Sequence, residues 1–550
     1  MPRWSKLLAR RGEEVATLTV LTNDIAREVS LSPGASVREL LETAGILVRS
    51  GCRGNGACGL CLVRVESGNV HGPTKTECLV LSPEQLEGKL RLACQLMPEH
   101  DLCIRVVHTA AKSDWRDLSP ALLPCTPSHL APVGDGGVTK NACGLAVDLG
   151  TTHISLSLWD LQHGERRSSR VGPNPQSHYG SDVVTRLIAT GESPENAQRI
   201  ARIALDAIRE AFLEMCWREG LSPEAVARVT IVGNTPMLAL LTGTDARTLL
   251  QPDSWTRRMD WSLEAPQHWV STLGINPQAT VEVIPPCAGF VGSDLLAGVL
   301  ATRLTDQPGS LLIDFGTNSE MALWDGRTLW FTSAAGGPAF ETAQLQCGMP
   351  AEPGAIYRVD RQQNTAELQY RVIGDGQAKG LCGSGLIDLI ACLRDAGDLT
   401  RTGRFAKQSL SEGLVIREES PTLRLSHVDV DMFQRAKAAI GVGIKTLLAR
   451  AQMDATKLSR ICVCGVFGQH LNCRNAQAVG LLPNVSSSHI ELCGNTALAG
   501  CEWLLVSPAK AADVVWLRER MTAINLSQSP EFERLFLESL YLEPMEADGA

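Results

Sequence analysis

Three cysteines lie within ten residues of one another in the segment CRGNGACGLC, which begins at Cys52. Cys52, Cys58 and Cys61 follow the spacing C-x5-C-x2-C, and a fourth cysteine, Cys94, comes after a gap long enough for a hairpin and a helix. Four thiolates suit either an all-cysteine zinc site or an iron–sulfur cluster. Zinc sites usually combine two short C-x2-C segments, whereas here three of the cysteines share one long loop.

The glycines of this loop favour the iron–sulfur cluster over zinc. Gly51, Gly54, Gly56 and Gly59 can adopt positive φ angles, which turns backbone N–H groups toward the sulfurs of an anionic cluster. We therefore predict that the four spaced cysteines are cluster ligands. The alternative is that they are ordinary core residues.

The segments around the loop predict the elements that position it. Residues 14–23 and 25–34 alternate like the two strands of a hairpin, 36–45 have helical periodicity, and 61–70 return as a strand. Together with the cysteine spacing, this arrangement resembles a β-grasp [2Fe–2S] ferredoxin over about residues 15–110. The resemblance implies a [2Fe–2S] cluster and electron transfer.

A second chemistry is indicated by a D-x-G-T turn that occurs twice. The segments GLAVDLGTTHISLSLWD and LLIDFGTNSEMALWD each contain an apolar strand, the turn and a second strand. Glycine lets the backbone approach a phosphate, N–H groups and Thr hydroxyls donate to its oxygens, and Asp can hold a hydrated Mg²⁺ ion. Two facing turns predict a phosphate clamp, and two purely structural hairpins are the alternative. The residues of the predicted clamp are Asp148, Gly150, Thr151, Thr152, Asp314, Gly316, Thr317 and Asn318.

The two halves that carry these turns resemble the superfamily of acetate kinase, sugar kinases, heat-shock chaperone ATPases and actin. The resemblance implies two duplicated α/β lobes that close on ATP. The later segment ICVCGVFGQHL resembles the adenosine motif of that superfamily, with Gly465 and Gly468 allowing close approach to the nucleoside. The segment GNTALAG, from Gly494, then predicts the start of a closing helix.

Several further segments are similar to one narrower family, the reductive activators of corrinoid proteins. The similarity extends in the same linear order over residues 15–505. It implies ATP-dependent reduction of an inactive cobalt(II) corrinoid protein to cobalt(I) in a methyl-transfer pathway, with an electron donor that the sequence does not identify. The segments are NPQSHYGSDVVTRL from Asn174, VGNTPM from Val232, PPCAGFVGSD from Pro285, AAGGPAFE from Ala334, CGMPAEPGAI from Cys347 and GLCGSGLIDL from Gly380.

Two features depart from that family. Its members often carry an extra domain before the ATPase lobes, and residues 111–140 leave no room for one, so the geometry of a homodimer stays open. The paired glycine that usually precedes FG is replaced in CGVFG, where Cys464 and Val466 change the local packing. Only details of nucleotide contact depend on this second departure.

Four other residues have alternative explanations. Asp294 is a candidate for orienting the attacking water, or it caps a helix. Ser333 is placed by the resemblance on the surface that faces the corrinoid partner, or it too caps a helix. Cys462 and Cys464 alternate in an apolar strand, so we expect packed thiols there rather than metal ligands.

Length and composition limit the remaining classes. The net charge of −9, without a long Lys/Arg run, argues against a nucleic-acid partner, and no apolar run approaches the roughly 18 residues of a membrane span. The 18 cysteines are spread along the chain, as expected for reduced thiols in the cytoplasm. We expect an N-terminal extension (1–14), a ferredoxin domain (15–110), a linker (111–140), two ATPase lobes (141–305 and 306–505) and a C-terminal helical tail (506–550).

Three other functions fit parts of the pattern. A small-molecule kinase uses the same ATPase fold, and an electron carrier needs no nucleotide at all. An activator of a radical dehydratase also shares the fold, but its cluster usually sits between subunits, which an N-terminal ferredoxin contradicts.

Overall fold

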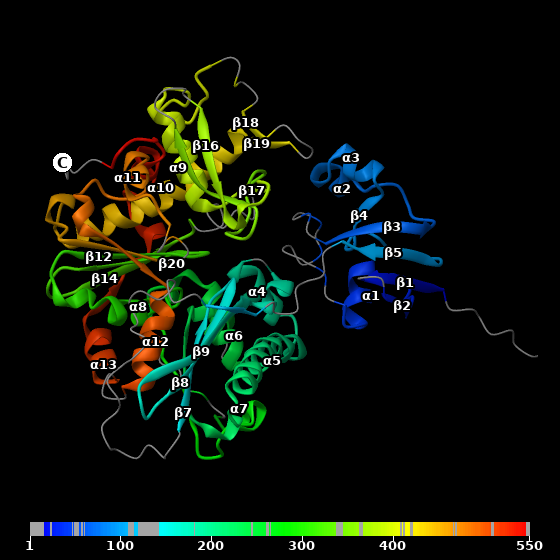
Figure 1. Ribbon diagram of the computed structural model, residues 1–550, viewed down its shortest axis with the longest axis horizontal. Helices are drawn as coiled ribbons and strands as arrows, with labels where there is room; N and C mark the ends of the chain where they lie inside the picture. Colours follow the sequence, from blue (N-terminus) through cyan, green and yellow to red (C-terminus); the bar gives the residue numbers. More distant parts are fainter. Residues whose placement is uncertain are drawn as a thin grey trace, which may run out of the picture. The chain divides into compact units, whose positions relative to one another are not determined.

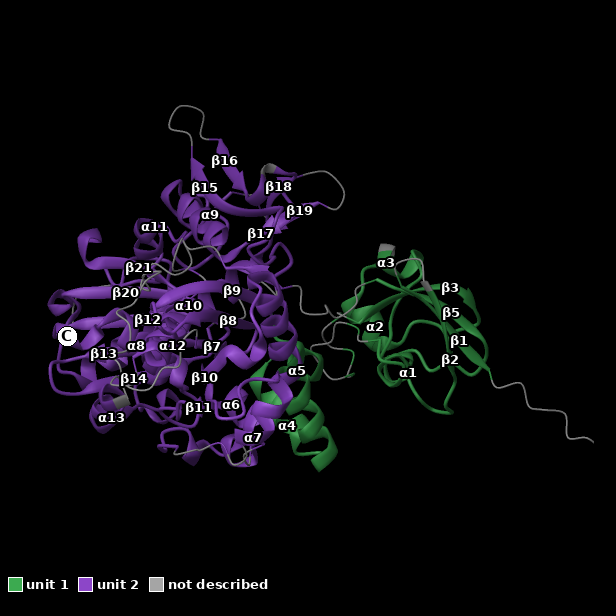
Figure 2. Cartoon of the chain, turned by 60° about the horizontal axis from the view of Figure 1, so that its bottom comes forward, with its two compact units in different colours: residues 1–114, 173–204 green, residues 115–172, 205–550 purple. Residues whose placement is uncertain are grey.

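The computed structural model (Figure 1) describes residues 16–22, 25–46, 48, 54, 56, 59, 61–107, 115–118, 142–180, 182–243, 246–259, 263, 266–336, 345–361, 367–407, 410, 413–417, 422–465, 467, 470–507 and 511–545. The chain forms two compact units (Figure 2). One contains residues 1–114 and 173–204, and the other contains residues 115–172 and 205–550.

A five-stranded sheet forms the N-terminal part of the first unit. β1 (Thr17–Thr22) pairs antiparallel with β2 (Ile25–Ser30) and parallel with β5 (Leu102–Val106). β3 (Leu62–Gly68) lies between β5 and β4 (Leu90–Leu92), which gives the order β2-β1-β5-β3-β4. The predicted hairpin and the predicted returning strand are both present, and the topology is that of a β-grasp.

Three short helices complete this sheet: α1 (Val37–Thr43), α2 (Lys75–Val80) and α3 (Pro83–Glu87). α1 begins with a capping box, in which the Ser36 hydroxyl accepts from the Glu39 N–H and the Glu39 carboxylate accepts from the Ser36 N–H. One face of α1 and alternate residues of the strands form a common core, which includes Leu18, Val20, Val37, Leu40, Leu41, Val63 and Ile104.

The segment 173–204 of the first unit carries the NPQSHYGSD motif. Asn174 caps the 3₁₀ helix η2 (Pro175–Tyr179), because its side chain accepts from the Gln176 N–H. Asp182 caps α4 (Val183–Thr190) in the same manner. The long helix α5 (Pro194–Glu219) begins here and continues into the second unit.

Two six-stranded sheets with the same topology form the centre of the second unit. In each, three antiparallel strands are followed by a fourth strand parallel to the first and a fifth parallel to the fourth. This repetition confirms the predicted duplicated lobes. The first sheet contains β7 (Cys143–Leu149), β8 (His153–Asp160), β9 (Glu165–Pro173), β10 (Val226–Gly233) and β11 (Thr280–Val283), and the second contains β12 (Ser310–Phe315), β13 (Ser319–Trp324), β14 (Leu329–Ala334), β20 (Arg460–Gly465) and β21 (Ile490–Gly494).

One helix follows the fifth strand of each sheet, and these two helices pack against each other. α8 (Ser293–Thr302) follows β11, and α12 (Thr496–Val506) follows β21 as the closing helix that the sequence predicts. Gly500 makes the close packing feasible, because a Cβ there would lie 2.0 Å from the carbonyl oxygen of Ala297. α6 (Thr235–Thr242) and α7 (Pro266–Leu273) belong to the first lobe.

The second lobe contains a long insertion between its third and fourth strands. Its small sheets and the buried helix α10 share one core with β12 and β13. The insertion contains β15 (Ala355–Arg361), β16 (Leu368–Val372), β17 (Gly380–Leu381), α9 (Gly383–Asp395), β18 (Leu414–Arg417), β19 (Leu423–Leu425) and α10 (His427–Arg450), and α11 (Cys473–Ala478) follows β20.

Two strands lie in segments that the sequence assigns to a linker and a tail. β6 (Arg116–Asp117) pairs with β9, while most of residues 111–140 lie outside the described residues. The C-terminal segment forms α13 (Ala511–Arg520) and α14 (Phe532–Ser539), but also β22 (Met521–Ala523), which pairs with β14. The domain boundaries stay a prediction, as does the extension 1–14, which lies outside the described residues. Within the described ranges, no helix combines the length and apolar character needed to cross a membrane.

Candidate cluster and nucleotide sites

Two of the four predicted cluster cysteines are described, and they lie together. The Cys61 thiol donates a hydrogen bond to the Cys94 sulfur at 3.4 Å, and both side chains are buried. That hydrogen bond lowers the pKa of Cys94 to about 7 against the opposing effect of burial, with help from Gln95 and the charge of Arg38. A favoured thiolate is the form that ligates metal. Cys52 and Cys58 lie outside the described residues.

The glycines of the cluster loop adopt the backbone conformation that the sequence predicts. Gly54, Gly56 and Gly59 have φ angles of +97°, +81° and +69°, and Gly51 lies outside the described residues. A side chain at Gly56 would also clash, because its Cβ would lie 2.5 Å from the Cγ2 atom of Thr76 on α2. The loop therefore needs glycine both for its conformation and for its closeness to the helix.

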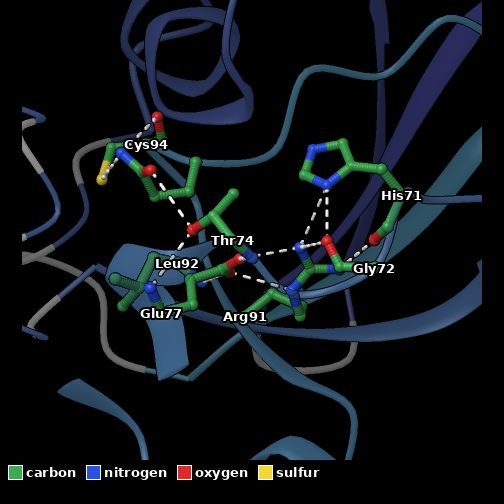
Figure 3. Close-up of polar contacts among 8 residues, drawn as sticks. His71, Gly72, Thr74, Glu77, Arg91, Leu92 and Cys94 are labelled. Atoms are coloured by element: carbon green, nitrogen blue, oxygen red, sulfur yellow. Dashed lines mark hydrogen bonds and ion pairs between the residues drawn. The ribbon is translucent and has the colours of Figure 1, made fainter. Parts of the chain in front are cut away.

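A buried ion pair holds Cys94 in place (Figure 3). Arg91 donates to the Glu77 carboxylate at 2.9 and 2.8 Å, and the Leu92 N–H donates to the same carboxylate at 3.0 Å. Burial raises the pKa of Glu77, but the hydrogen bonds from Arg91, Thr74 and Leu92 outweigh burial and lower it overall. Because Glu77 is on α2 and Arg91 is on β4, the pair fixes the strand that ends just before Cys94.

The two lobes of the second unit enclose a cavity of about 260 Å³. Both D-x-G-T turns line it, and the Thr152 and Thr317 hydroxyls join the turns through a hydrogen bond of 2.6 Å. The sequence predicted turns that face each other, and the structure brings them together. The lining includes Asp148, Gly150, Thr151, Thr152, Asp294, Asp314, Gly316, Thr317, Asn318 and Gly465 from the predicted set, and also Asn234, Glu320 and Asn495.

Strand ends and tight turns place these groups. Asp148 and Asp314 occupy corresponding positions near the ends of β7 and β12. The Gly150 N–H donates to the His153 carbonyl at 3.0 Å, and a Cβ on Gly150 would lie 2.7 Å from that oxygen. Gly465 has a φ of +75°, and its Cβ would lie 2.4 Å from Asp314 Oδ1. Only glycine lets these turns approach the cavity so closely.

The carboxyl groups of the cavity repel one another. Burial raises the pKa of Asp148 to about 7, and the charge of Asp294 adds to the effect. Burial and the charge of Asp148 likewise raise the pKa of Asp314 to about 7. Burial and the neighbouring charges of Asp294 and Asp314 raise the pKa of Glu320 well above its usual range, so Glu320 keeps its proton in the hydrogen bond to Asp294.

This arrangement fits a hydrated divalent cation. None of the described residues that line the cavity is Lys or Arg, and burial lowers the pKa of His153, the one histidine among them, which disfavours its charged form. Asn234 donates to Glu320 at 3.3 Å, while its buried Oδ1 has no hydrogen-bond partner among the described residues. Carboxylates and water are the ligands that Mg²⁺ prefers. Asp148 and Asp314 would hold such an ion, and Asn234 Oδ1 offers an acceptor for its water.

Glu320, Asn234 and Asn495 were not predicted from the sequence. Glu320 is paired with Asp314 in the register of β12 and β13, so strand alternation after the second turn is the signal that could have found it. Asn495 donates to Asp148 Oδ2 at 3.1 Å while its Oδ1 accepts from the Leu498 N–H and caps α12. Both asparagines lie in the tripeptide Gly-Asn-Thr, which occurs at 233–235 and 494–496.

The remaining predicted residues have varied outcomes. Asp294 lines the cavity in the first turn of α8, and the alternative that it is the N-cap is wrong because Gly292 occupies that position. Ser333 lies on β14, paired with Glu320 in the strand register, and is not among the cavity-lining residues. Its partner-facing role stays a prediction. Gly468 lies outside the described residues.

A second cavity of about 390 Å³ lies beside the segment that follows Gly465. The ring centroids of Tyr357 and His470, which both line it, lie 5.7 Å apart. It is polar, with two arginines and one aspartate. The lining residues are Tyr357, Arg358, Asp360, Arg371, His470 and Leu471.

Three family models match the chain in sequence order. Residues 21–99 match the 2Fe–2S iron–sulfur cluster binding domain, 143–307 match the RACo middle region, and 309–549 match the C-terminal ASKHA domain of RACo. The fold and the two sites thus define a [2Fe–2S] ferredoxin joined to a two-lobed ATPase.

Similar proteins support a narrower assignment. The chain is 30% identical over 420 residues to the corrinoid activation enzyme RamQ of Eubacterium limosum, covering 72% of this chain and 70% of RamQ. It is 27% identical over 430 residues to the [Co(II) methylated amine-specific corrinoid protein] reductase of Methanosarcina barkeri, covering 72% and 76%. The solved structure of a reductive activator for corrinoid, iron–sulfur protein is 26% identical with a TM-score of 0.65, covering 96% of this chain and 99% of that one. The chain belongs to the family of reductive activators of corrinoid proteins.

Proposed function

We propose that this protein uses ATP to move an electron from its [2Fe–2S] cluster to the inactive cobalt(II) of a corrinoid protein, which produces cobalt(I). One observation carries the proposal: a thiol pair in a ferredoxin and a carboxylate-lined cavity between two ATPase lobes occur in one chain. The electron balance is simple. The reduced cluster loses one electron, the cobalt gains it, and an external donor, which the sequence does not identify, reloads the cluster.

Energetics explains why the two activities are joined. Plant-type [2Fe–2S] clusters have potentials near about −400 mV, and a one-electron transfer becomes tenfold less favourable for every ~59 mV uphill. Reduction of cobalt(II) in a corrinoid is uphill for such a donor. ATP can drive the transfer if its bound and hydrolysed states bind the corrinoid protein with different affinity.

Within the nucleotide site, each part of the chain has a separate task. Bound Mg²⁺ would neutralise the phosphate charge and the repelling carboxylates together. The Thr152 and Thr317 hydroxyls and the N–H groups of the turns bind phosphate oxygens, while Asn495 orients Asp148. Asp294 accepts a hydrogen bond from protonated Glu320, and its proposed task is to orient the attacking water.

The polar second cavity is the proposed site for the nucleoside. Two of its lining residues, His470 and Leu471, follow Gly465 in the segment that is similar to an adenosine motif. The rings of Tyr357 and His470 offer flat surfaces for a base. Replacing His470 with Ala should raise the KM for ATP with a smaller effect on kcat, because the base takes no part in hydrolysis.

The partner is a corrinoid protein of a methyltransferase system. The 18 cysteines are spread along a long chain, as expected for a protein of a reducing compartment, so we place the protein in the cytoplasm. A homodimer stays a prediction, and sedimentation of the full chain tests it.

ATP hydrolysis measured with purified corrinoid proteins tests the proposal and separates it from a kinase. A cobalt(II) corrinoid protein should stimulate hydrolysis, and the cobalt(I) form should stimulate it less. Phosphate release should match ATP consumption. A phosphorylated metabolite formed in place of free phosphate would favour the kinase alternative.

A further inference from the structure

Two neighbouring strands of the second lobe carry side chains of types that can ligate a metal, and these side chains lie outside the nucleotide cavity. The sulfurs of Cys462 and Cys493 and a carboxylate oxygen of Glu491 all lie within 4.8 Å of one another. Cys462 is on β20, and the other two residues are on β21, the edge strand of the sheet. The sequence predicts a packed thiol at Cys462, but it does not indicate that Glu491 lies beside it.

The strand register explains why these three residues meet. Cys462 is paired with Glu491 across the parallel strands, and Cys493 lies two residues beyond Glu491, on the same face of the sheet. The alternate residues Ile461 and Val463 belong to the core on the opposite face. The backbone therefore brings the three ligand groups to one face.

The group extends from the core to the surface. Cys462 is 0% exposed and Cys493 is 2% exposed, whereas the Glu491 side chain is 49% exposed. An ion can therefore reach the thiols from the solvent side at Glu491. The thiol of Cys464 also lies nearby, because it forms a hydrogen bond with Cys493.

Arg460 holds Glu491 in position. Its Nε and Nη2 atoms donate to the two carboxylate oxygens at 2.8 and 2.6 Å, and its Nη1 atom donates to the carbonyl of Thr302, at the end of α8, at 2.6 Å. A carboxylate offers about four lone-pair positions, so Glu491 can accept both hydrogen bonds and still bind a cation. An outer partner of this kind orients a metal ligand.

We propose that Cys462, Cys493 and Glu491 bind a thiophilic divalent cation, with zinc as the preferred ion. Two thiolates and one carboxylate, offset by Arg460 and the two charges of the ion, make the group electrically neutral, which the buried thiolates require. Zinc takes sulfur and carboxylate ligands together in tetrahedral sites, and a water molecule completes the coordination. Binding releases the two thiol protons to solvent.

The position gives such an ion a structural consequence. β20 ends in Gly465, and Asn495 follows β21; both residues line the nucleotide cavity. An ion between Cys462 on β20 and the two ligands on β21 would link the edge strand to its neighbour. Both strands lead directly to residues that line the nucleotide cavity. We expect bound zinc to raise the melting temperature of the protein. The folded chain holds the three ligands together, so zinc binds the folded chain in preference to the unfolded chain.

Zinc binding to the full chain with an intact cluster tests the proposal. Iron analysis first confirms that the cluster is complete, since vacant cluster cysteines would bind zinc. One equivalent of Zn²⁺ is then added, and zinc-edge X-ray absorption should report at least two sulfur neighbours at about 2.3 Å. Competition with a chelator gives the affinity.

Matched variants assign the site. Cys462→Ser should lower zinc affinity by ~10²-fold and Glu491→Gln by ~10-fold, whereas the control Cys216→Ser, a buried thiol on α5, should change nothing. Glu491→Gln alters an exposed side chain, so it keeps the test valid if the buried variant does not fold. Wild-type affinity in Cys462→Ser and Glu491→Gln, zinc without sulfur neighbours, or no binding would each overturn the proposal.

Discussion

The neighbours of Cys94 lower the pKa of a thiol, whereas the surroundings of Asp148 raise the pKa of a carboxyl. Hydrogen bonds from Cys61 and Gln95 and the charge of Arg38 favour the Cys94 thiolate. At Asp148, burial and the charge of Asp294 disfavour the carboxylate, and only Asn495 opposes them. Both side chains are buried, so burial alone does not decide the outcome.

The difference corresponds to what each site binds. An anionic iron–sulfur cluster needs donors and positive charge around its sulfurs, and at Cys94 the loop residue Cys61, Gln95 and Arg38 of α1 supply them. The proposed magnesium–nucleotide complex would bring a positive metal ion, and the cavity offers carboxylate acceptors that repel one another without it. The predictions below test this contrast, starting with the largest effect.

The largest effect is expected from Cys94→Ser. Loss of a thiolate ligand should prevent assembly of a stable [2Fe–2S] cluster and abolish cobalt(I) formation. ATP binding should persist, because the nucleotide cavity belongs to the other compact unit. Iron analysis and nucleotide titration check the two halves of this prediction. Loss of ATP binding together with the cluster would contradict independent sites.

Removing the aspartate of either D-x-G-T turn should affect the nucleotide site and leave the cluster site intact. Asp148→Ala and Asp314→Ala should each lower ATP hydrolysis by ~10²-fold or more, because charge stabilisation through the metal is lost. The visible spectrum of the cluster should stay unchanged. Steady-state phosphate release measures the loss, and full hydrolysis in both variants would refute the clamp.

A smaller effect is expected at Glu320, whose role is to hold a proton beside Asp294. Glu320→Ala removes the buried hydrogen bonds to Asp294 and Asn234 and should lower kcat for ATP by ~10-fold. Glu320→Gln keeps a donor for Asp294 and should stay within ~3-fold of the wild-type kcat. Equal losses in both variants would show that the carboxyl itself takes part in the chemistry.

The last predicted effect is on the stability of the protein in the absence of nucleotide, and it depends on pH. The pKa of Asp148 is about 7 in the folded protein, above its ordinary value of 3.8. Between these two pH values, folding therefore takes up a proton. The contribution of Asp148 to the free energy of unfolding declines as pH rises through 7. Asp148→Asn removes that decline. The variant should therefore gain on the order of 1–3 kcal/mol relative to wild type between pH 4 and pH 8.

Denaturant unfolding followed by tryptophan fluorescence at both pH values measures this difference. At pH 8, saturating Mg²⁺ and ATP should make the wild type more stable than Asp148→Asn, because the bound metal then favours the wild-type carboxylate. A difference that does not change with pH would mean that Asp148 is not held in an unfavourable charged state.

Local motifs pointed to Cys61 and Cys94, which lie together, and to the two turns that line the cavity. A turn with positive φ angles is set by residues next to one another in the sequence. The positions of Gly54, Gly56 and Gly59 among the cysteines were therefore enough to predict their conformation. The repeated turns likewise contain their own phosphate-binding groups, and the duplicated sheets follow from the apolar strands around them.

The residues that were missed depend on distant pairing. Glu320 reaches the cavity through the register of β12 with β13, and Asn495 reaches Asp148 from a separate segment 347 positions along the chain. β6 and β22 are short strands that gain partners only in the folded sheets, so the sequence around them indicates a linker and a tail. The N-cap alternative for Asp294 failed because Gly292, two residues earlier, is the N-cap of α8, which begins at Ser293.

Cobalt(I) formation, followed by absorbance under strict anaerobiosis, tests the central claim most directly. The protein with a reduced cluster is mixed with a cobalt(II) corrinoid protein, with ATP, with a non-hydrolysable analogue, or without nucleotide. We predict that rapid reduction requires ATP, and that Asp314→Ala, with its cluster intact, fails as the nucleotide-free sample does. Equally rapid reduction without nucleotide, or in Asp314→Ala, would contradict the account and leave a ferredoxin whose ATPase serves another purpose.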